Sequence, residues 1–185
     1  MPAPLLSRRD LEFYLYEMFD VEALATRQRY EDHNRESFNA ALDIAEKIAE
    51  DYFVPIRKTV DLNQPDWDGE KVVMIPEIKI AYDAVAEAGL ICPDQSYEMG
   101  GMQLPLVVTS CAMGYITAAA STTNGFHALT AANANLLETH ASQEQIETWV
   151  PRLRTGEFAG TMALSEPQAG SSLADMRTKA IAQDD

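Results

Sequence analysis

Residues 160–172 read GTMALSEPQAGSS, and the interpretation of the chain starts from them. Met162, Ala163 and Leu164 are apolar enough for a short buried strand. Ser165-Glu166-Pro167 ends regular pairing, because proline has no N–H to give a sheet ladder and disfavours helix in the residue before it. The Ala-Gly-Ser-Ser turn that follows can direct N–H groups and hydroxyls at a phosphate or at the polar rim of a flavin. Taken alone, the stretch fits a plain turn equally well.

The longer string GEFAGTMALSEPQAGS at 156–171, with RTKA at 177–180, resembles the flavin-binding signature of the acyl-CoA dehydrogenase family. That signature is a (Thr/Ser)-Glu-Pro-x-x-Gly-Ser-Asp loop leading into a strand that ends in Thr-Lys-Ala. Ser172 departs from it, since the family usually has Asp there. The resemblance extends from about Glu36 onward. Residues 1–35 are similar to the N-terminal extension of a larger subfamily active on 3-(methylthio)propanoyl-CoA and long-chain acyl-CoA.

The pattern of the residues predicts a mainly α-helical chain. A capping serine, a proline or a glycine marks most of the expected helix ends. The clearest apolar stripe falls at 36–54, before Pro55. The other predicted helices are one from Ser7 through Leu11 to Met18, one from Pro76 to Gly89, two small-residue helices at 104–120 and 123–138, and one from Ser142, paired with Gln145, to Gly156. Trp67, in the turn-rich link 63–69, is interpreted as an anchor packed on the core.

The resemblance implies an orthogonal helical N-terminal domain of an acyl-CoA dehydrogenase, followed by the first strand or strands of a middle β domain. We therefore expect three segments. Residues 1–35 are an extension with one helix, 36–157 are the helical domain, and 158–185 begin the β domain with a strand from about Phe158.

The charge and composition of the chain make several classes of binding partner and location less suitable. Lys and Arg total 14 against 29 Asp and Glu, a formal net charge of −15, so a nucleic-acid backbone or an anionic membrane is a poor partner. The apolar run Leu104–Ala120 contains Pro105 and several hydroxyl residues and falls short of a membrane span. Cys92 and Cys111 form no CxxC pattern and are interpreted as apolar thiols. Met1–Asp10 has no signal-peptide core, so the expected location is the cytoplasm.

No catalytic centre follows from the spacing of residues. His33, His127 and His140 are scattered and are interpreted as surface or satisfied core histidines. No group of Cys, His or carboxylate residues has the spacing of metal ligands, and neither GxSxG nor HExxH occurs. No carboxylate is identified as a base.

What the resemblance implies is FAD-dependent removal of two hydrogens from the α and β carbons of an acyl-CoA. The base glutamate is expected beyond residue 185. Met162, Leu164, Ser165, Gly170 and Ser171 are the implied FAD-binding residues. The Leu164 backbone and the Ser165 hydroxyl would face the isoalloxazine edge, and Ser171 would reach the pyrophosphate side and the substrate. The implied partners are an electron-transfer flavoprotein and a homodimer or homotetramer.

Two alternatives remain open at this point. One is a flavin-binding protein of the same fold with a stress or DNA-protection role. The other is a non-catalytic helical interaction module, which becomes the leading interpretation if the chain truly ends at Asp185.

Overall fold

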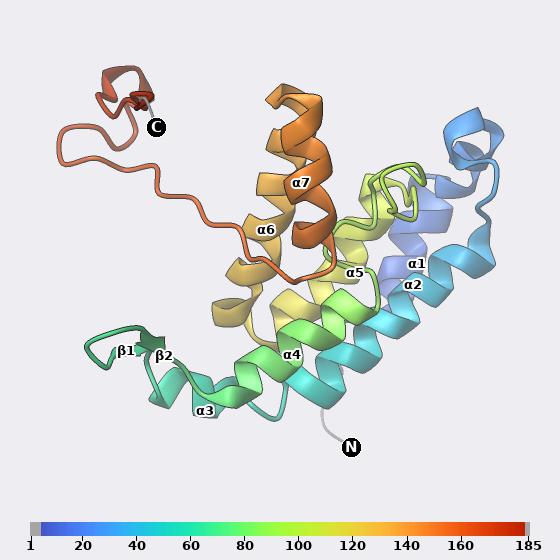
Figure 1. Ribbon diagram of the computed structural model, residues 1–185. Helices are drawn as coiled ribbons and strands as arrows, with labels where there is room; N and C mark the ends of the chain where they lie inside the picture. The colour runs from blue at the N-terminus through green and yellow to red at the C-terminus, as the bar shows by residue number, and fades with distance from the viewer. Residues whose placement is uncertain (1–4, 184–185) are drawn as a thin grey trace.

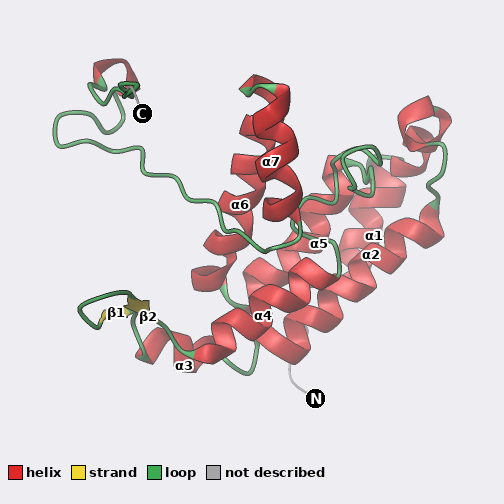
Figure 2. Ribbon diagram, viewed as in Figure 1, coloured by secondary structure: helices red, strands yellow, loops and turns green. Residues whose placement is uncertain are grey.

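The computed structural model describes residues 5–183, so the outermost residues of the predicted first and third segments, 1–4 and 184–185, lie outside the described residues. The described part is mainly helical, as predicted, with one short antiparallel pair of strands (Figure 2). Its α-helices are α1 Arg8–Glu12, α2 Arg35–Ile48, α3 Arg57–Leu62, α4 Pro76–Glu87, α5 Leu106–Ala119, α6 Ser121–His140 and α7 Gln143–Arg154.

The N-terminal extension begins where the sequence predicts and then departs from a single helix. The Ser7 side chain accepts a hydrogen bond from the Asp10 N–H at the start of α1, as expected of an N-cap. The helix then continues as a π-helix, η1 Phe13–Met18, followed by two 3-10 turns, η2 Val21–Thr26 and η3 Gln28–Tyr30. Arg8 joins the extension to α2 through an ion pair with Asp43 at 2.8 Å.

The core lies where α2, α4 and α5 meet the pair α6 and α7 (Figure 1). Helix α2 carries the predicted apolar stripe, and its continuation η4 Ala49–Phe53 ends just before Pro55. Burial of these apolar side chains is the main favourable term for the fold. The largest fully buried hydrophobic side chains are Leu15, Phe38, Leu42, Phe53, Val85, Leu90, Val108, Tyr115, Ile116 and Val150.

Local sequence signals set the ends of the helices around the site. Pro76 is the first residue of α4, and Gly89 adopts a φ of +71° just after its end. Ser142 and Gln145 form the predicted reciprocal capping box at the start of α7, with both hydrogen bonds present. These signals fix both ends of α4 and the place where the chain turns from α6 into α7.

The interpretation of Trp67 as a core anchor is wrong. Trp67 is 60% exposed and belongs to a two-stranded hairpin, β1 Asp66–Trp67 with β2 Val72–Val73. The hairpin projects beyond the end of α3 (Figure 1). Asp66 is paired with Val73 and Trp67 with Val72, so the two strands are neighbours of each other.

The C-terminal segment leaves the helices as an extended chain (Figure 1). The strand expected from about Phe158 does not form within residues 158–183, which contain an isolated bridge between Glu166 and Ala169 and the 3-10 turn η5 Leu173–Asp175. A strand requires a neighbouring strand to complete its ladder, and among the described residues the only sheet is the β1–β2 pair, which does not include this segment. None of the helices within residues 5–183 is both long enough and apolar enough to span a membrane.

Candidate functional site

The stretch that the sequence singles out forms a loop closed by the Glu166 carboxylate. Its oxygens accept the N–H groups of Arg177 and Thr178, each at 2.9 Å, and a hydrogen bond from the Gln168 amide. The Glu166 backbone also exchanges two hydrogen bonds with Ala169, at 2.9 and 3.0 Å. One carboxylate therefore joins the two ends of residues 166–178, which are otherwise irregular.

These hydrogen bonds keep Glu166 ionised. The Thr178 side chain, followed by the N–H groups of Arg177 and Thr178, lowers the pKa of Glu166 from 4.5 to about 2. A carboxylate with so low a pKa, and with its oxygens already hydrogen-bonded, is a poor general base. The hydrogen bonds therefore assign Glu166 a structural part in closing the loop.

All five predicted cofactor-binding residues lie on or directly before this loop, and all are exposed: Met162, Leu164, Ser165, Gly170 and Ser171. Within residues 5–183, no protein group hydrogen-bonds the hydroxyl of Ser165 or Ser171. A Cβ added at Gly170 would meet no atom within 4 Å. The loop therefore offers free hydroxyls and an uncrowded backbone at its surface.

Ser172, the position that departs from the family signature, hydrogen-bonds a carboxylate. Its hydroxyl donates to Asp175, three residues further on, in the short η5 turn. A negative charge is thus present beside position 172, although residue 172 itself does not carry it.

The segment before the loop is fixed to α7 and α6. The Phe158 N–H donates to the Arg152 carbonyl at 3.1 Å, and the Phe158 ring packs against Trp149 at 5.7 Å between centroids. Further along, Gly160 and Thr161 hydrogen-bond side chains of α6. The chain thus leaves the helical body at a defined place before it reaches Met162.

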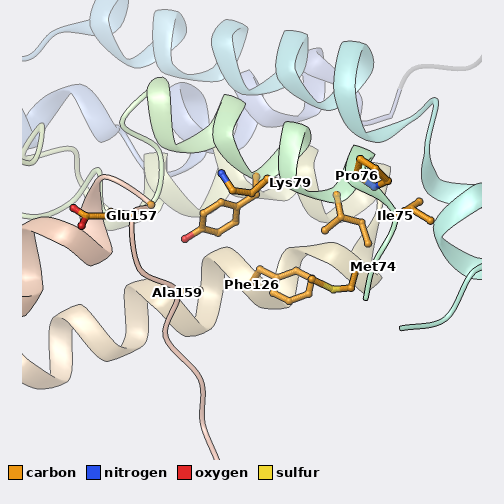
Figure 3. Close-up of a pocket in the computed structure, with 10 residues that line it drawn as sticks. Met74, Ile75, Pro76, Lys79, Phe126, Glu157 and Ala159 are labelled. Carbon is orange, nitrogen blue, oxygen red and sulfur yellow. The ribbon is translucent and has the colours of Figure 1, made fainter. Parts of the chain in front are cut away.

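Beside this segment lies a pocket of about 360 Å³ (Figure 3). The loop before α4, α4 itself, α6 and the chain after α7 contribute its mostly apolar walls, a typical lining for a small-molecule site. Figure 3 shows Met74, Ile75 and Pro76 toward one end and Glu157 toward the other. Its lining residues are Met74, Ile75, Pro76, Ile78, Lys79, Tyr82, Phe126, Gly156, Glu157 and Ala159.

Sequence reasoning missed this pocket. Pro76 and Gly156 were identifiable as helix-end signals, but nothing local indicated that their neighbourhoods meet. Gly156 is needed at this junction, since its φ is +75° and a Cβ there would lie 2.8 Å from Ala86 Cβ. The charge of Lys79 at the pocket is offset by Asp83, whose carboxylate lies 2.5 Å from Nζ.

His127 lies under this region, stacked on Tyr82 with 4.8 Å between ring centroids and tilted against Phe53 at 5.8 Å. It is buried, as a core histidine would be, but neither ring nitrogen has a partner among the described residues. Burial lowers the pKa of His127 from 6.5 to about 4, so the ring is neutral near pH 7. His127 is therefore buried but not a satisfied core histidine, whereas the half-buried His33 has ring nitrogens near the Ser37 hydroxyl and the Met102 carbonyl, at 3.2 and 2.9 Å.

The described residues contain no group of three or more His, Cys, Asp or Glu side chains able to hold a metal ion. Cys92 and Cys111 are free thiols, and burial raises the pKa of Cys92 to about 12. Among residues 5–183, the exposed loop lies further along the chain than the pocket, which only residues 156, 157 and 159 of the C-terminal segment line.

Comparison with known proteins agrees with the sequence resemblance. Residues 36–157 match the family model described as acyl-CoA dehydrogenase, N-terminal domain. Over 184 residues the chain is 32% identical to a butyryl-CoA dehydrogenase of Syntrophomonas wolfei, covering 97% of this chain and 30% of that protein.

Two further relatives cover a similar range. A 3-methylmercaptopropionyl-CoA dehydrogenase of Ruegeria pomeroyi is 29% identical over 177 residues, which are 96% of this chain and 30% of the relative. A broad-specificity linear acyl-CoA dehydrogenase of Mycobacterium tuberculosis is 28% identical over 179 residues, 96% of this chain and 29% of the relative. The chain thus spans about 30% of the length of the curated relatives it matches.

Proposed function

The chain belongs to the acyl-CoA dehydrogenase family, and on that basis we propose that it forms the N-terminal part of an FAD-dependent enzyme that dehydrogenates acyl-CoA thioesters between the α and β carbons. The observation that carries the proposal is the loop closed by Glu166, which leaves the hydroxyls of Ser165 and Ser171 without protein partners. The names of the relatives support acyl-CoA as the class of substrate.

The residues of the loop are chemically suited to a flavin. Ser165, Ser171 and the backbone around Gly170 offer hydrogen-bond donors, which match the oxygen and nitrogen acceptors of an isoalloxazine edge and a pyrophosphate. Met162 and Leu164, 46% and 41% exposed, offer apolar surface that a flat ring can cover. The Glu166 charge is directed at the N–H groups of Arg177 and Thr178, which limits its repulsion of a phosphate.

The proposed roles of the loop residues in FAD binding follow from the hydrogen-bonding groups that they carry. Ser165 would hydrogen-bond the ring edge, and Ser171 would hold both the pyrophosphate side and the substrate. When bound, FAD supplies the acceptor for the hydride that leaves the β carbon. Glu166 is unsuited to take the α-proton because its carboxylate is already hydrogen-bonded. As the family resemblance implies, we propose that the base is a glutamate outside residues 1–185.

The proposed partners follow from the same assignment. An electron-transfer flavoprotein would oxidise the reduced enzyme, and copies of the same polypeptide would form a homodimer or homotetramer in the cytoplasm. The net charge of −15 disfavours the alternative of a DNA-protection role.

The test uses a full-length polypeptide that contains this chain. We expect a yellow protein that bleaches under anaerobic conditions on addition of butyryl-CoA or 3-methylmercaptopropionyl-CoA. Ser171→Ala should weaken FAD binding by about five- to tenfold, the equivalent of one hydrogen bond of about 1 kcal/mol. Ser121→Ala, an exposed serine at the start of α6, is the matched control. A colourless protein that reduces no dye with short, branched or long acyl-CoA would refute the proposal.

A further inference from the structure

Two side chains of α6 hydrogen-bond the backbone just before the loop. The Gly160 N–H donates to Thr130 Oγ1 at 3.0 Å, and Asn133 Nδ2 donates to the Thr161 carbonyl at 3.0 Å. Thr130 and Asn133 are three positions apart, so they lie on the same face of the helix. Thr130 supplies a hydrogen-bond acceptor and Asn133 supplies a donor. The backbone of a neighbouring strand would offer the same two kinds of group.

The Thr130 hydroxyl is held in place for this contact. It is fully buried, and it donates its own proton to the Phe126 carbonyl at 2.6 Å. With the proton engaged, the oxygen presents a lone pair to the Gly160 N–H. Asn133 is similarly oriented, because its amide also donates to the Leu129 carbonyl at 2.9 Å.

The backbone approaches α6 as closely as glycine allows. A Cβ added at Gly160 would lie 2.7 Å from Asn133 Nδ2 and 2.8 Å from Asn133 Cβ. Both distances are below ordinary van der Waals contact. Any other residue at 160 would push the segment off the helix or displace Asn133.

These contacts determine which residues of the C-terminal segment face α6, that is, the register of the segment. Side chains of an extended segment alternate between two faces, so we expect Met162 and Leu164 to share one face and Ala163 and Ser165 the other. A slip of one residue would exchange them with Ala163 and Ser165. Pairing Gly160 with Thr130, and Thr161 with Asn133, prevents that slip.

We propose that Thr130 and Asn133 are positioning residues that set the register of the flavin-binding segment Met162–Ser171, an inference that rests on the proposed function. Neither residue is among those expected to touch the cofactor. Both act through the backbone of Gly160 and Thr161.

The first test needs no cofactor. In the 185-residue chain, Thr130→Val removes the acceptor and keeps the shape of the side chain. We expect amide hydrogen exchange at Gly160 to accelerate about five- to tenfold, as for loss of one hydrogen bond of about 1 kcal/mol. Thr130→Ser, which restores the hydroxyl, should recover the slow exchange. Thr139→Val is the control, since the Thr139 hydroxyl donates to the Asn135 carbonyl of the same helix and, within residues 5–183, to nothing in the C-terminal segment. Unchanged exchange at Gly160 in Thr130→Val would overturn the proposal.

The second test measures flavin binding in the full-length polypeptide. We expect Thr130→Val and Asn133→Ala each to raise the FAD dissociation constant about five- to tenfold and to alter the shape of the flavin absorption band. Thr139→Val should change the dissociation constant less than twofold. Asn133→Ala, at a half-buried position, keeps the test valid if Thr130→Val misfolds.

The outcomes separate the two proposals. A wild-type protein that binds FAD, with variants that bind it equally well, would overturn the positioning role and leave the proposed function intact. A wild-type protein without flavin would overturn the proposed function, and the positioning role with it. Recovery of affinity and band shape in Thr130→Ser would support the positioning role over a general loss of stability.

Discussion

Replacing His127 with phenylalanine should remove a pH-dependent loss of stability between pH 7.5 and 5. The His127 ring is buried, its nitrogens have no partners among the described residues, and burial lowers its pKa to about 4. In the unfolded chain the pKa returns to about 6.5. Between these two values the unfolded state binds more protons than the native state, so the free energy of unfolding falls as the pH is lowered.

The size of the effect follows from the two pKa values. At 1.36 kcal/mol for each pH unit, their separation gives about 3 kcal/mol once the pH is below both values, of which about 2 kcal/mol is lost by pH 5. Phenylalanine keeps a ring of similar size stacked on Tyr82 and cannot be protonated. His127→Phe should therefore lose about 2 kcal/mol less than the wild type between pH 7.5 and 5.

The assay is urea denaturation at both pH values, with the free energy of unfolding extrapolated to water. Titrating groups common to both proteins cancel in the comparison, and the low pKa of Glu166 places its titration below pH 4.5. His140→Gln, at an exposed position, is the control and should behave like the wild type. If wild type and His127→Phe lose stability equally, within about 0.5 kcal/mol, the reasoning from burial is refuted.

Two further predictions concern the C-terminal segment. Glu166→Gln should open the loop, so that amide exchange at Arg177 and Thr178 becomes faster. Because the pKa of Glu166 is lowered to about 2, the wild-type loop should be closed above pH 4.5 and lose that protection as the pH falls toward 2. Gly160→Ala should accelerate exchange at residue 160, because the new Cβ would lie 2.8 Å from Asn133 Cβ, whereas exchange unaffected by the added methyl would contradict that close approach.

The helices could be predicted because their signals are local. An apolar stripe defines α2, Pro76 begins α4, and Ser142 with Gln145 caps α7, each within a few residues of the element it controls. The same local evidence could not give the π-helical turns, which leave no distinct mark in the pattern. It also misplaced Trp67, because an indole in a link can pack on the core or lie in a hairpin, and the residues around it do not distinguish the two.

The sequence alone could indicate an exposed, donor-rich turn, but it could not indicate which distant residues contact the segment that leads into it. The sequence of residues 162–171 indicates a turn rich in donors, and the structure keeps those donors exposed. The hydrogen bonds to Gly160 and Thr161, just before the turn, come from Thr130 and Asn133, roughly 30 residues earlier in the chain. The pocket likewise combines residues from Met74 to Ala159. Such convergence depends on how helices pack, which no local pattern encodes.

At Glu166 the structure gives a sequence feature a purpose that the sequence alone does not indicate. The sequence interpretation treats Ser165-Glu166-Pro167 only as an interruption of regular pairing. In the structure the Glu166 carboxylate accepts two N–H groups that a neighbouring strand would otherwise accept, so the loop closes without a sheet beside it. A loop already closed before any ligand arrives has less conformational entropy to lose on binding. We therefore expect Glu166→Gln to weaken FAD binding although the carboxylate itself need not touch the flavin.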